Sequence, residues 1–423
     1  MNINTKTDSS VFLDALTEQV PQLLHNSTVF LSPSFDLIMW ASLSFNVLVI
    51  TVTTVFLVKR LIGCWFGTKH GQSKPNPSKL QVERERAETF PQAFPNGWFR
   101  ICNSNQVSRG ASQLFNYFGR EIVVFRGKSG KIGVLDAHCP HLGANLGIEG
   151  SVVNDCIQCP FHLWEFGTNG ECTSIPYCEK VPANSSIYSW PTVERYGMVM
   201  VWYHSNRESP DYDAIQIPEL DGDKFIAGSS YIYENVKMNI QDFAENSADV
   251  QHFAPLHGKM LLPWSGPRSI FGRSIHVPFV EIIHKADFLL SNDEKHVAYF
   301  TNSACLSVFG RKITSTTVNA KITFYGPCGI TLFQFDGSFG KIYLFHTHTP
   351  TSATSLDVGF LVFSERKISS LLVWYIVGNW IAQWQNDILV WENKIYRNKP
   401  LLVKVSFCSK VFCVNGNTHD HVQ

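Results

Sequence analysis

The sequence has few charged residues and no excess of either sign. Of its 423 residues, 35 are Lys or Arg and 35 are Asp or Glu, which gives a formal net charge of zero. Proteins that bind nucleic acid usually need a basic surface, so this balance argues against a nucleic-acid partner. The charged fraction is only 17%, below the roughly 25% of typical soluble domains. Aromatic residues make up 13%, which supplies a large core and excludes extensive disorder.

The charges are also missing from one continuous stretch, the run from Leu37 to Val58. A helix of this length, at about 1.5 Å per residue, spans a bilayer. Lys59 and Arg60 follow it directly, whereas acidic residues outnumber basic ones before it. The positive-inside rule therefore predicts a transmembrane helix over residues 37–58, a lumenal segment over 1–36 and a cytosolic remainder. A buried core helix and a cleaved signal peptide are the alternatives, and no basic segment precedes the run as a signal peptide would require.

The rest of the chain divides into three parts. Residues 59–89 are polar, contain prolines and are predicted to be a linker. Residues 90–204 alternate short β-like runs with turn residues, which predicts an all-β domain. Residues 205–423 combine strand-like runs with a helix near 239–252 and a tryptophan-rich helix near 368–396. This pattern predicts an α+β domain with an antiparallel sheet.

Two short segments pair a cysteine with a histidine. Cys139 and His141 are followed, after 17 intervening residues, by Cys159 and His162, in the pattern C-x-H-x17-C-x2-H. Zinc could bind this set, but zinc sites usually place like ligands next to each other. One Cys and one His on each arm favour a Rieske [2Fe–2S] cluster, where one iron takes two thiolates and the other two imidazoles. The 11 cysteines are predicted to be thiols or ligands rather than disulfides. Three near the motif are predicted to be buried thiols outside the cluster: Cys156, Cys172 and Cys178.

A second motif, D-x2-H-x4-H, consists of Asp249, His252 and His257. On a helix, Asp249 and His252 would share one face, and Pro255 is expected to bend the helix so that His257 returns toward His252. Two imidazoles and one carboxylate form the facial triad of a mononuclear non-haem Fe(II) site, with open positions for O2 and substrate. The carboxylate could come from Asp249 or from two later acids, Asp387 and Glu392.

The motifs together resemble one family. The segments CPHLGANLG (139–147) and CPFHLWEF (159–166) are similar to the Rieske domain of ring-hydroxylating-type oxygenases. The segments QDFAENSADVQHFAPLH (241–257) and NDILVWENK (386–394) resemble those of Neverland-type sterol enzymes, the cholesterol 7-desaturases of animals. This resemblance covers nearly the whole chain after residue 58 and implies a helix-grip (START-like) catalytic domain.

The resemblance also implies roles for individual residues. Asp387 would complete the iron site with His252 and His257. Asp249 would carry electrons from the cluster of one subunit to the iron of the next, which implies a head-to-tail ring, a homotrimer. Asn246 would either orient the iron face or be a plain surface amide. Four further histidines are given less weight: packing is the favoured role of His346 and His348, and His419 and His421 are expected to be solvated.

The expected reaction follows from these sites. No glycine-rich dinucleotide turn is present in the sequence, so electrons from NAD(P)H would arrive through a separate reductase. By the resemblance, O2 is used to convert cholesterol to 7-dehydrocholesterol for steroid hormone biosynthesis, at a membrane expected to be the endoplasmic reticulum. The alternatives are a steroid hydroxylase of the ketosteroid 9α-hydroxylase type and a non-enzymatic membrane Rieske electron-transfer protein. The second alternative would have no use for an iron site.

Overall fold

The computed structural model describes residues 77–291, 293–397 and 400–401. The run 37–58 predicted to cross a membrane lies outside these residues, as do His419 and His421. Within the described ranges, no helix has the length and apolar character needed to span a bilayer. The described residues from Val82 onward belong to one compact unit.

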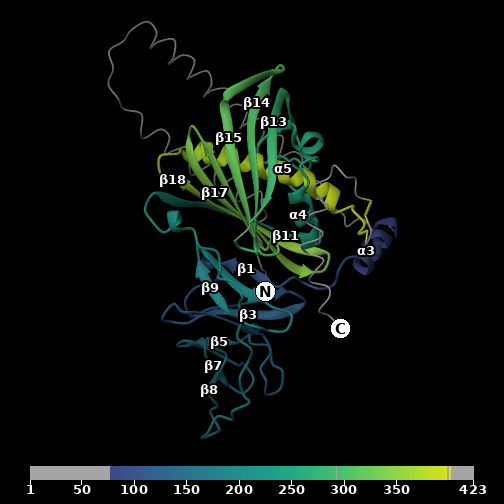
Figure 1. Cartoon of the computed structure of the whole chain (residues 1–423). Helices are drawn as coiled ribbons and strands as arrows, with labels where there is room; N and C mark the ends of the chain where they lie inside the picture. Colours follow the sequence, from purple (N-terminus) through teal and green to yellow (C-terminus); the bar gives the residue numbers. More distant parts are fainter. Residues whose placement is uncertain (1–76, 292, 398–399, 402–423) are drawn as a thin grey trace, which may run out of the picture. The chain divides into compact units, whose positions relative to one another are not determined.

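The first part of this unit is all-β, as predicted (Figure 1). A helix, α3 (Pro77–Thr89), precedes it, where the sequence predicted only a linker. The strands that follow are β1 (Gly97–Asn103), β2 (Ser112–Tyr117), β3 (Arg120–Arg126), β4 (Ile132–Asp136), β5 (Ser151–Val153), β6 (Cys156–Gln158), β7 (Glu165–Phe166), β8 (Cys172–Ser174), β9 (Thr192–Arg195) and β10 (Met198–Tyr203), with a short 3₁₀ turn, η1 (Ser104–Gln106), after β1. They form three antiparallel sheets in the orders β1-β10-β9, β2-β3-β4 and β5-β6-β7-β8.

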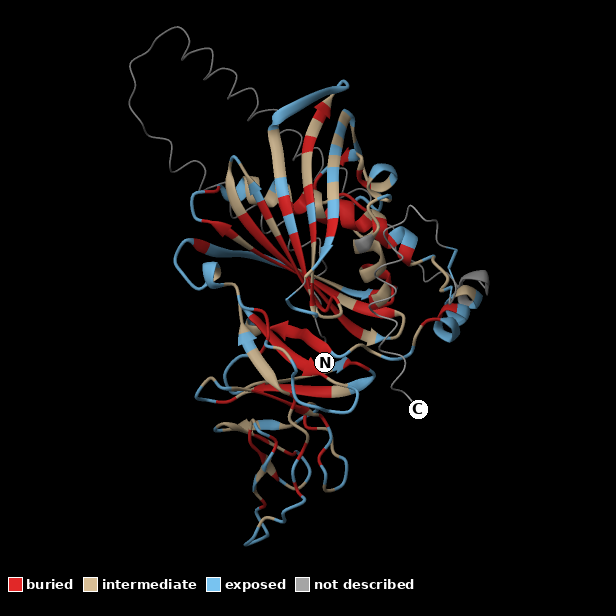
Figure 2. Cartoon of the chain, viewed as in Figure 1, coloured by how far each residue is buried: buried red, intermediate tan, exposed pale blue. Residues whose placement is uncertain are grey.

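The second part is built on one curled antiparallel sheet of eight strands. After the turn η2 (Pro218–Leu220), the strands are β11 (Phe225–Val236), β12 (Lys259–Leu261), β13 (His276–Leu290), β14 (Val297–Val308), β15 (Arg311–Tyr325), β16 (Ile330–Gly337), β17 (Gly340–Ser352) and β18 (Ser355–Glu365). Their order is β11-β18-β17-β16-β15-β14-β13-β12. Strands β16, β17 and β18 are mostly buried, whereas β13 and β15 carry many exposed residues (Figure 2).

Strand β17 is buried along nearly its whole length because both of its faces are covered. On one face, Thr347 accepts a hydrogen bond of 2.9 Å from Nε of Arg100 on β1, which joins the sheet to the first part of the chain. On the other face, His346 and His348 contact Phe243. The two histidines lie on the same face because they are two residues apart on a strand.

The helices of the second part are α4 (Ile240–Ala248) and α5 (Ser370–Trp391), with a π-helical turn, η3 (Phe253–His257), between α4 and β12. The predicted helix over 239–252 is therefore too long. Asp249 has extended backbone, and its carboxylate accepts a hydrogen bond of 2.9 Å from the backbone N–H of Gln251. This local bond competes with helix continuation. Asp249 and His252 thus share no helix face, and Pro255 lies inside η3.

Candidate metal centres and substrate cavity

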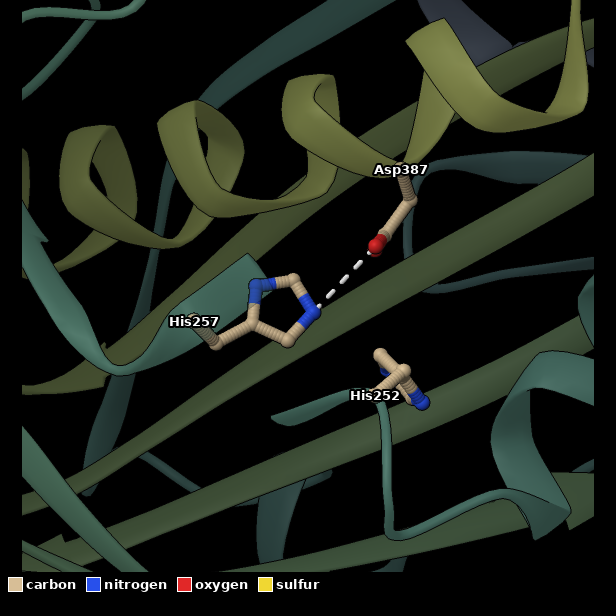
Figure 3. Close-up of side chains that lie close together, drawn as sticks. All are labelled: His252, His257 and Asp387. Carbon is tan, nitrogen blue, oxygen red and sulfur yellow. Dashed lines mark ion pairs between the residues drawn. The ribbon is translucent and has the colours of Figure 1, made fainter. Parts of the chain in front are cut away.

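Three side chains from separate segments converge beside α5. They are His252, which precedes η3, His257 at the end of η3, and Asp387 on α5 (Figure 3). Their candidate ligand atoms all lie within 4.8 Å of one another. The two later residues are buried, and His252 is only 11% exposed. The structure therefore brings together the three residues expected to hold mononuclear iron.

The orientation of His257 is fixed by a glutamine that the sequence did not single out. Nε2 of Gln383 donates a hydrogen bond of 3.0 Å to the carbonyl of Lys259, which turns Oε1 of the amide toward His257. Nδ1 of His257 donates to this oxygen at 3.2 Å. Gln383 lies one helical turn before Asp387 on α5, and this i, i+4 spacing was the available signal.

This arrangement fits a bound cation. With the proton on Nδ1, the lone pair of His257 Nε2 faces Oδ1 of Asp387 at 3.3 Å. Two acceptors at that distance need a proton or a metal ion between them. A metal-ligating histidine usually donates its other N–H to a nearby oxygen, as His257 does to Gln383. The donor set of two imidazoles and one carboxylate suits non-haem iron.

The electrostatics of the two histidines differ. Burial opposes the charged form of His257, but the Asp387 carboxylate outweighs it and raises the pKa. Burial lowers the pKa of His252. One imidazole is therefore held neutral and available as a ligand, while the proton on the other can be replaced by a cation.

Of the remaining candidate residues, Asn246 and Asp249 lie close to His252, whereas Glu392 does not. Asn246 on α4 places Nδ2 at 3.3 Å from Nε2 of His252, so it lies at the ligand face. Oδ2 of Asp249 lies 3.9 Å from Nδ1 of His252, and its side chain is 43% exposed. Glu392 follows the end of α5 and pairs with Arg268 at 2.6 Å, away from the three ligands.

An apolar cavity of about 420 Å³ opens onto these ligands. This volume lies within the range of roughly 300–1,000 Å³ typical of small-molecule sites. Its wall combines the inner faces of β13 to β16 with α5, and includes Phe253, Ile322, Phe335 and Trp380. His346 also lines it, whereas His348 does not. The favoured packing role is therefore incomplete for His346.

Two further residues in the wall were missed at the sequence level. Nε2 of His284, on β13, donates a hydrogen bond of 3.1 Å to the carbonyl of His257. Nδ2 of Asn302, on β14, lies 3.0 Å from Nδ1 of His284. No short motif marks either residue, and only the pairing of β13 with β14 brings them together.

The cysteine–histidine pairs lie at the tips of two similar loops. In one, the N–H of Cys139 donates to the carbonyl of Ala144, and the N–H of Gly143 to that of Cys139. The other repeats this pattern with Cys159, Trp164 and Leu163. Gly143 and Leu163, at matching positions, both have positive φ, 75° and 60°. Two equivalent hairpins thus present one thiol and one imidazole each.

The four side chains at these tips fit an iron–sulfur cluster. Both cysteines are buried, and the rings of His141 and His162 lie with centroids 4.6 Å apart. Burial, with the neighbouring Cys159, raises the pKa of the Cys139 thiol to about 11. A bound metal is what would hold such a thiol as thiolate.

The other nearby cysteines lie outside the two tips. Cys156 and Cys172 are half-buried, and Cys178 is exposed. The prediction that all three are buried was therefore wrong, because the core-facing residue of β6 is Ile157 and not Cys156, and Cys172 on β8 packs against that core only in part.

Residues 97–190 match the Rieske [2Fe-2S] domain family, and residues 201–407 match the 3-ketosteroid 9alpha-hydroxylase C-terminal domain. A cholesterol 7-desaturase of Xenopus laevis is 33% identical over 79% of this chain and 74% of its own length. The chain belongs to the cholesterol 7-desaturase family of Rieske oxygenases. As an oxidoreductase of this family it uses a Rieske cluster and a mononuclear iron.

Two more distant proteins share the architecture of this family. A probable 3-ketosteroid-9-alpha-monooxygenase oxygenase component of Rhodococcus rhodochrous is 26% identical, over 76% of this chain and 79% of its own length. The crystal structure of dicamba monooxygenase bound to 3,6-dichlorosalicylic acid superposes with a TM-score of 0.57 at 17% identity, covering 78% of this chain and 98% of the other. The second likeness shows that the fold is shared.

Proposed function

We propose that this chain is the terminal oxygenase of a cholesterol 7-desaturase system. The reaction removes one hydrogen each from C7 and C8 of cholesterol and gives 7-dehydrocholesterol. One O2 is reduced to two molecules of water with two electrons from the sterol and two from NAD(P)H, which a separate reductase transfers. The apolar cavity that ends at His252, His257 and Asp387 carries this proposal, because a sterol ring system is almost entirely hydrocarbon.

The metal groups would each contribute one kind of chemistry. When bound, the cluster held by Cys139, His141, Cys159 and His162 passes single electrons, and the mononuclear iron held by His252, His257 and Asp387 activates O2. The protein would fix the orientation of the side chains that bind the iron. Gln383 keeps the proton of His257 on Nδ1.

The cavity wall would decide which carbon reacts. Phe253 packs between the rings of His257 and Phe300, with centroids 5.2 and 5.3 Å away, so an apolar surface adjoins the ligands. This surface excludes water and places the sterol edge against the site. Asn246, 3.3 Å from His252, is the nearest polar side chain on α4 and would orient that imidazole.

The wider assembly extends this proposal. We expect a homotrimer in which Asp249 connects the cluster of one subunit to the iron of its neighbour, and a catalytic domain of the helix-grip class over residues 205–423. Exposed apolar side chains beside the cluster support a contact surface there: Leu142, Phe161 and Leu163. We also expect the run 37–58 to anchor the protein in the endoplasmic reticulum membrane, where its neutral substrate dissolves.

The product in sterol-fed cells tests the reaction. We expect cells that express the chain with a suitable reductase to accumulate a sterol with two hydrogens fewer than cholesterol, identified by mass spectrometry. His252→Ala is the control, because it removes an iron ligand and leaves the cluster loops intact. A product with one added oxygen instead would show a hydroxylase of the ketosteroid 9α type, to which the match of residues 201–407 also points.

A further inference from the structure

Several polar atoms in the cavity wall have no hydrogen-bond partner among the described residues, and one of them is an amide oxygen. Asn302 lies on β14 and is 8% exposed, and its neighbours on the same face, Phe300 and Ala304, also line the cavity. Its amide oxygen, Oδ1, is buried and finds no hydrogen-bond donor among the residues that the structure describes. A buried acceptor without a donor is costly, and its pairing by a ligand recovers that cost.

The orientation of this amide follows from the groups behind it. The carbonyl of His257 can only accept, so Nε2 of His284, at 3.1 Å, carries the hydrogen. In the neutral imidazole, Nδ1 is then an acceptor, and Asn302 must turn its NH2 group toward it, at 3.0 Å. The opposite orientation would set two acceptors face to face. The side chain of Asn302, which lines the cavity, therefore has Oδ1 as its unpaired acceptor.

We propose that Oδ1 of Asn302 accepts a hydrogen bond from the 3β-hydroxyl of the sterol and so selects hydroxysterols over 3-ketosteroids. This inference rests on the proposed sterol substrate. A hydroxyl donates to Oδ1, whereas a ketone oxygen has only lone pairs and would leave two acceptors facing each other in an apolar wall. A site that binds a substrate hydroxyl in this way rejects analogues that lack the donor.

The same contacts make Asn302 a positioning residue. It is tied through His284 to the backbone of His257, a residue expected to bind iron. The fused rings of a sterol are rigid, so an anchored oxygen at C3 fixes how far C7 reaches toward the iron site. Loss of this hydrogen bond is therefore expected to lower the selectivity for the reacting carbon as well as the selectivity among sterols.

His346, Trp380 and Trp384 are the competing residues, because their ring nitrogens are also buried without partners in the described part of the chain and they line the same cavity. The indole N–H of a tryptophan donates to a hydroxyl or a ketone oxygen alike. A neutral imidazole offers one donor and one acceptor. It would therefore bind a hydroxyl or a ketone about equally, which separates its effect from that of an amide oxygen.

Equilibrium binding to the full-length, metal-loaded protein tests the proposal. The probes are labelled cholesterol, its 3-keto analogue cholest-5-en-3-one and 3-deoxycholesterol. We expect the wild type to bind cholesterol about 10- to 100-fold more tightly than either analogue, since one unpaired buried acceptor is at stake. Asn302→Leu should bind all three sterols within about twofold of one another.

His346→Phe is the matched control, since it also removes an unpartnered polar side chain from the cavity wall. It should keep the preference for cholesterol. The proposal is overturned if Asn302→Leu retains the preference, or if His346→Phe abolishes it. A general folding defect would weaken the binding of all three sterols together and leave the ratio of their affinities unchanged. Circular dichroism would show such a defect directly. Wild-type protein that binds none of the three would instead refute the proposed sterol function.

Discussion

Asp249 lies between solvent and His252, a proposed iron ligand. Its carboxylate is 43% exposed and lies 3.9 Å from Nδ1 of His252, a buried ring atom without a hydrogen bond among the described residues. Its other oxygen accepts from the N–H of Gln251, which holds the loop before η3. A charge that touches a ligand and remains accessible is suited to pass an electron or orient an imidazole.

Asp249→Asn is expected to keep both metal centres and to slow electron transfer between them. The amide still accepts the hydrogen bond from Gln251 through its oxygen, so the loop should survive, but the negative charge beside His252 is lost. Loss of such a supporting group typically lowers activity about 10- to 100-fold. Single-turnover oxidation of the reduced cluster, followed by its visible absorption, measures the step.

Iron analysis of the same variant gives the contradicting outcome. If Asp249→Asn protein purifies without mononuclear iron, Asp249 is a ligand and not a connection between centres. Asp249→Ala would complete the series, because it removes the hydrogen bond to Gln251 as well as the charge.

At the scale of single residues, the sequence pointed to the candidate metal ligands but not to the side chains that hydrogen-bond around them. The spacing of Cys139, His141, Cys159 and His162 is itself the signature of a cluster, and no fold was needed to see it. Asp387 is different, because it lies in an apolar helix with Glu392 close by, and the resemblance to a family decided between them. Gln383 and Asn302 become visible only when the fold brings α5 and β14 to His257.

The segment after α5 ties that helix to α4. Nζ of Lys394 lies 2.9 Å from Asp242 and 2.6 Å from Glu245. Asp242 is buried at the start of α4, where it also accepts the N–H of Asn239. Since α4 carries Asn246 and α5 carries Asp387, this ion pair holds together two elements that form the iron site.

Lys394→Met is expected to lower the free energy of unfolding by about 2–3 kcal/mol, because it leaves the buried carboxylate of Asp242 without a counter-charge. Chemical denaturation followed by fluorescence measures the change. Lys295→Met, at an exposed position without an ion pair among the described residues, is the control and should change stability by less than about 0.5 kcal/mol.

The defect in Lys394→Met should depend on pH. Burial raises the pKa of Asp242 above its ordinary value, and Lys394 opposes that rise. Without the lysine the folded-state pKa rises further, so the folded variant holds a proton that the unfolded chain releases. Stability of the variant therefore falls as pH rises through this window. The gap to wild type should narrow below the ordinary pKa of an aspartate and be widest near neutral pH.

Close contact between α5 and the loop after β12 depends on Gly378. A Cβ added there would lie 2.1 Å from the indole nitrogen of Trp264, whose backbone N–H already donates to the carbonyl of Gly378. Gly378→Ala is expected to displace α5, with a cost of about 1–3 kcal/mol and weaker retention of iron. Gly222→Ala, which meets nothing within 4 Å, is the control. Unchanged iron content in Gly378→Ala would show that α5 tolerates the shift.

Elements were predicted where their pattern was local. The apolar periodicity of α5 and the short β runs of the first part were clear in the sequence, since each follows from neighbouring residues. Strand β13 was missed because its exposed face carries Ile283 and Leu289 as well as charged residues, so polar and apolar residues do not alternate cleanly. The early end of α4 depends on a side-chain bond of Asp249, which periodicity does not report.

On the scale of the whole molecule, the proposed trimer makes a sharp prediction for mixed chains. Cys139→Ser should lack the cluster spectrum, and His257→Ala should keep that spectrum but lose mononuclear iron and turnover. If electrons cross between subunits, each variant supplies what its neighbour lacks. Random assembly of equal amounts should then restore about a quarter of wild-type activity.

Separately purified and unmixed variants are the control, and both should be inactive. Mixed trimers that stay inactive, despite exchange of subunits shown by mass spectrometry, would mean that electrons pass within one chain.

The class of each part, all-β followed by a sheet with helices, was predictable from the order of its patterns. The arrangement of subunits was not, because it depends on contacts between separate chains.

The pairing of β11 with β18 also has a consequence in time. A ribosome releases the chain from its N-terminus, and domains generally fold as they emerge. The four cluster ligands lie between residues 139 and 162 and become available together. The iron site must wait for residue 387, and its sheet for residues 355–365. A cell that makes this protein is therefore expected to deliver its two metal cofactors in a set order, cluster first and iron last.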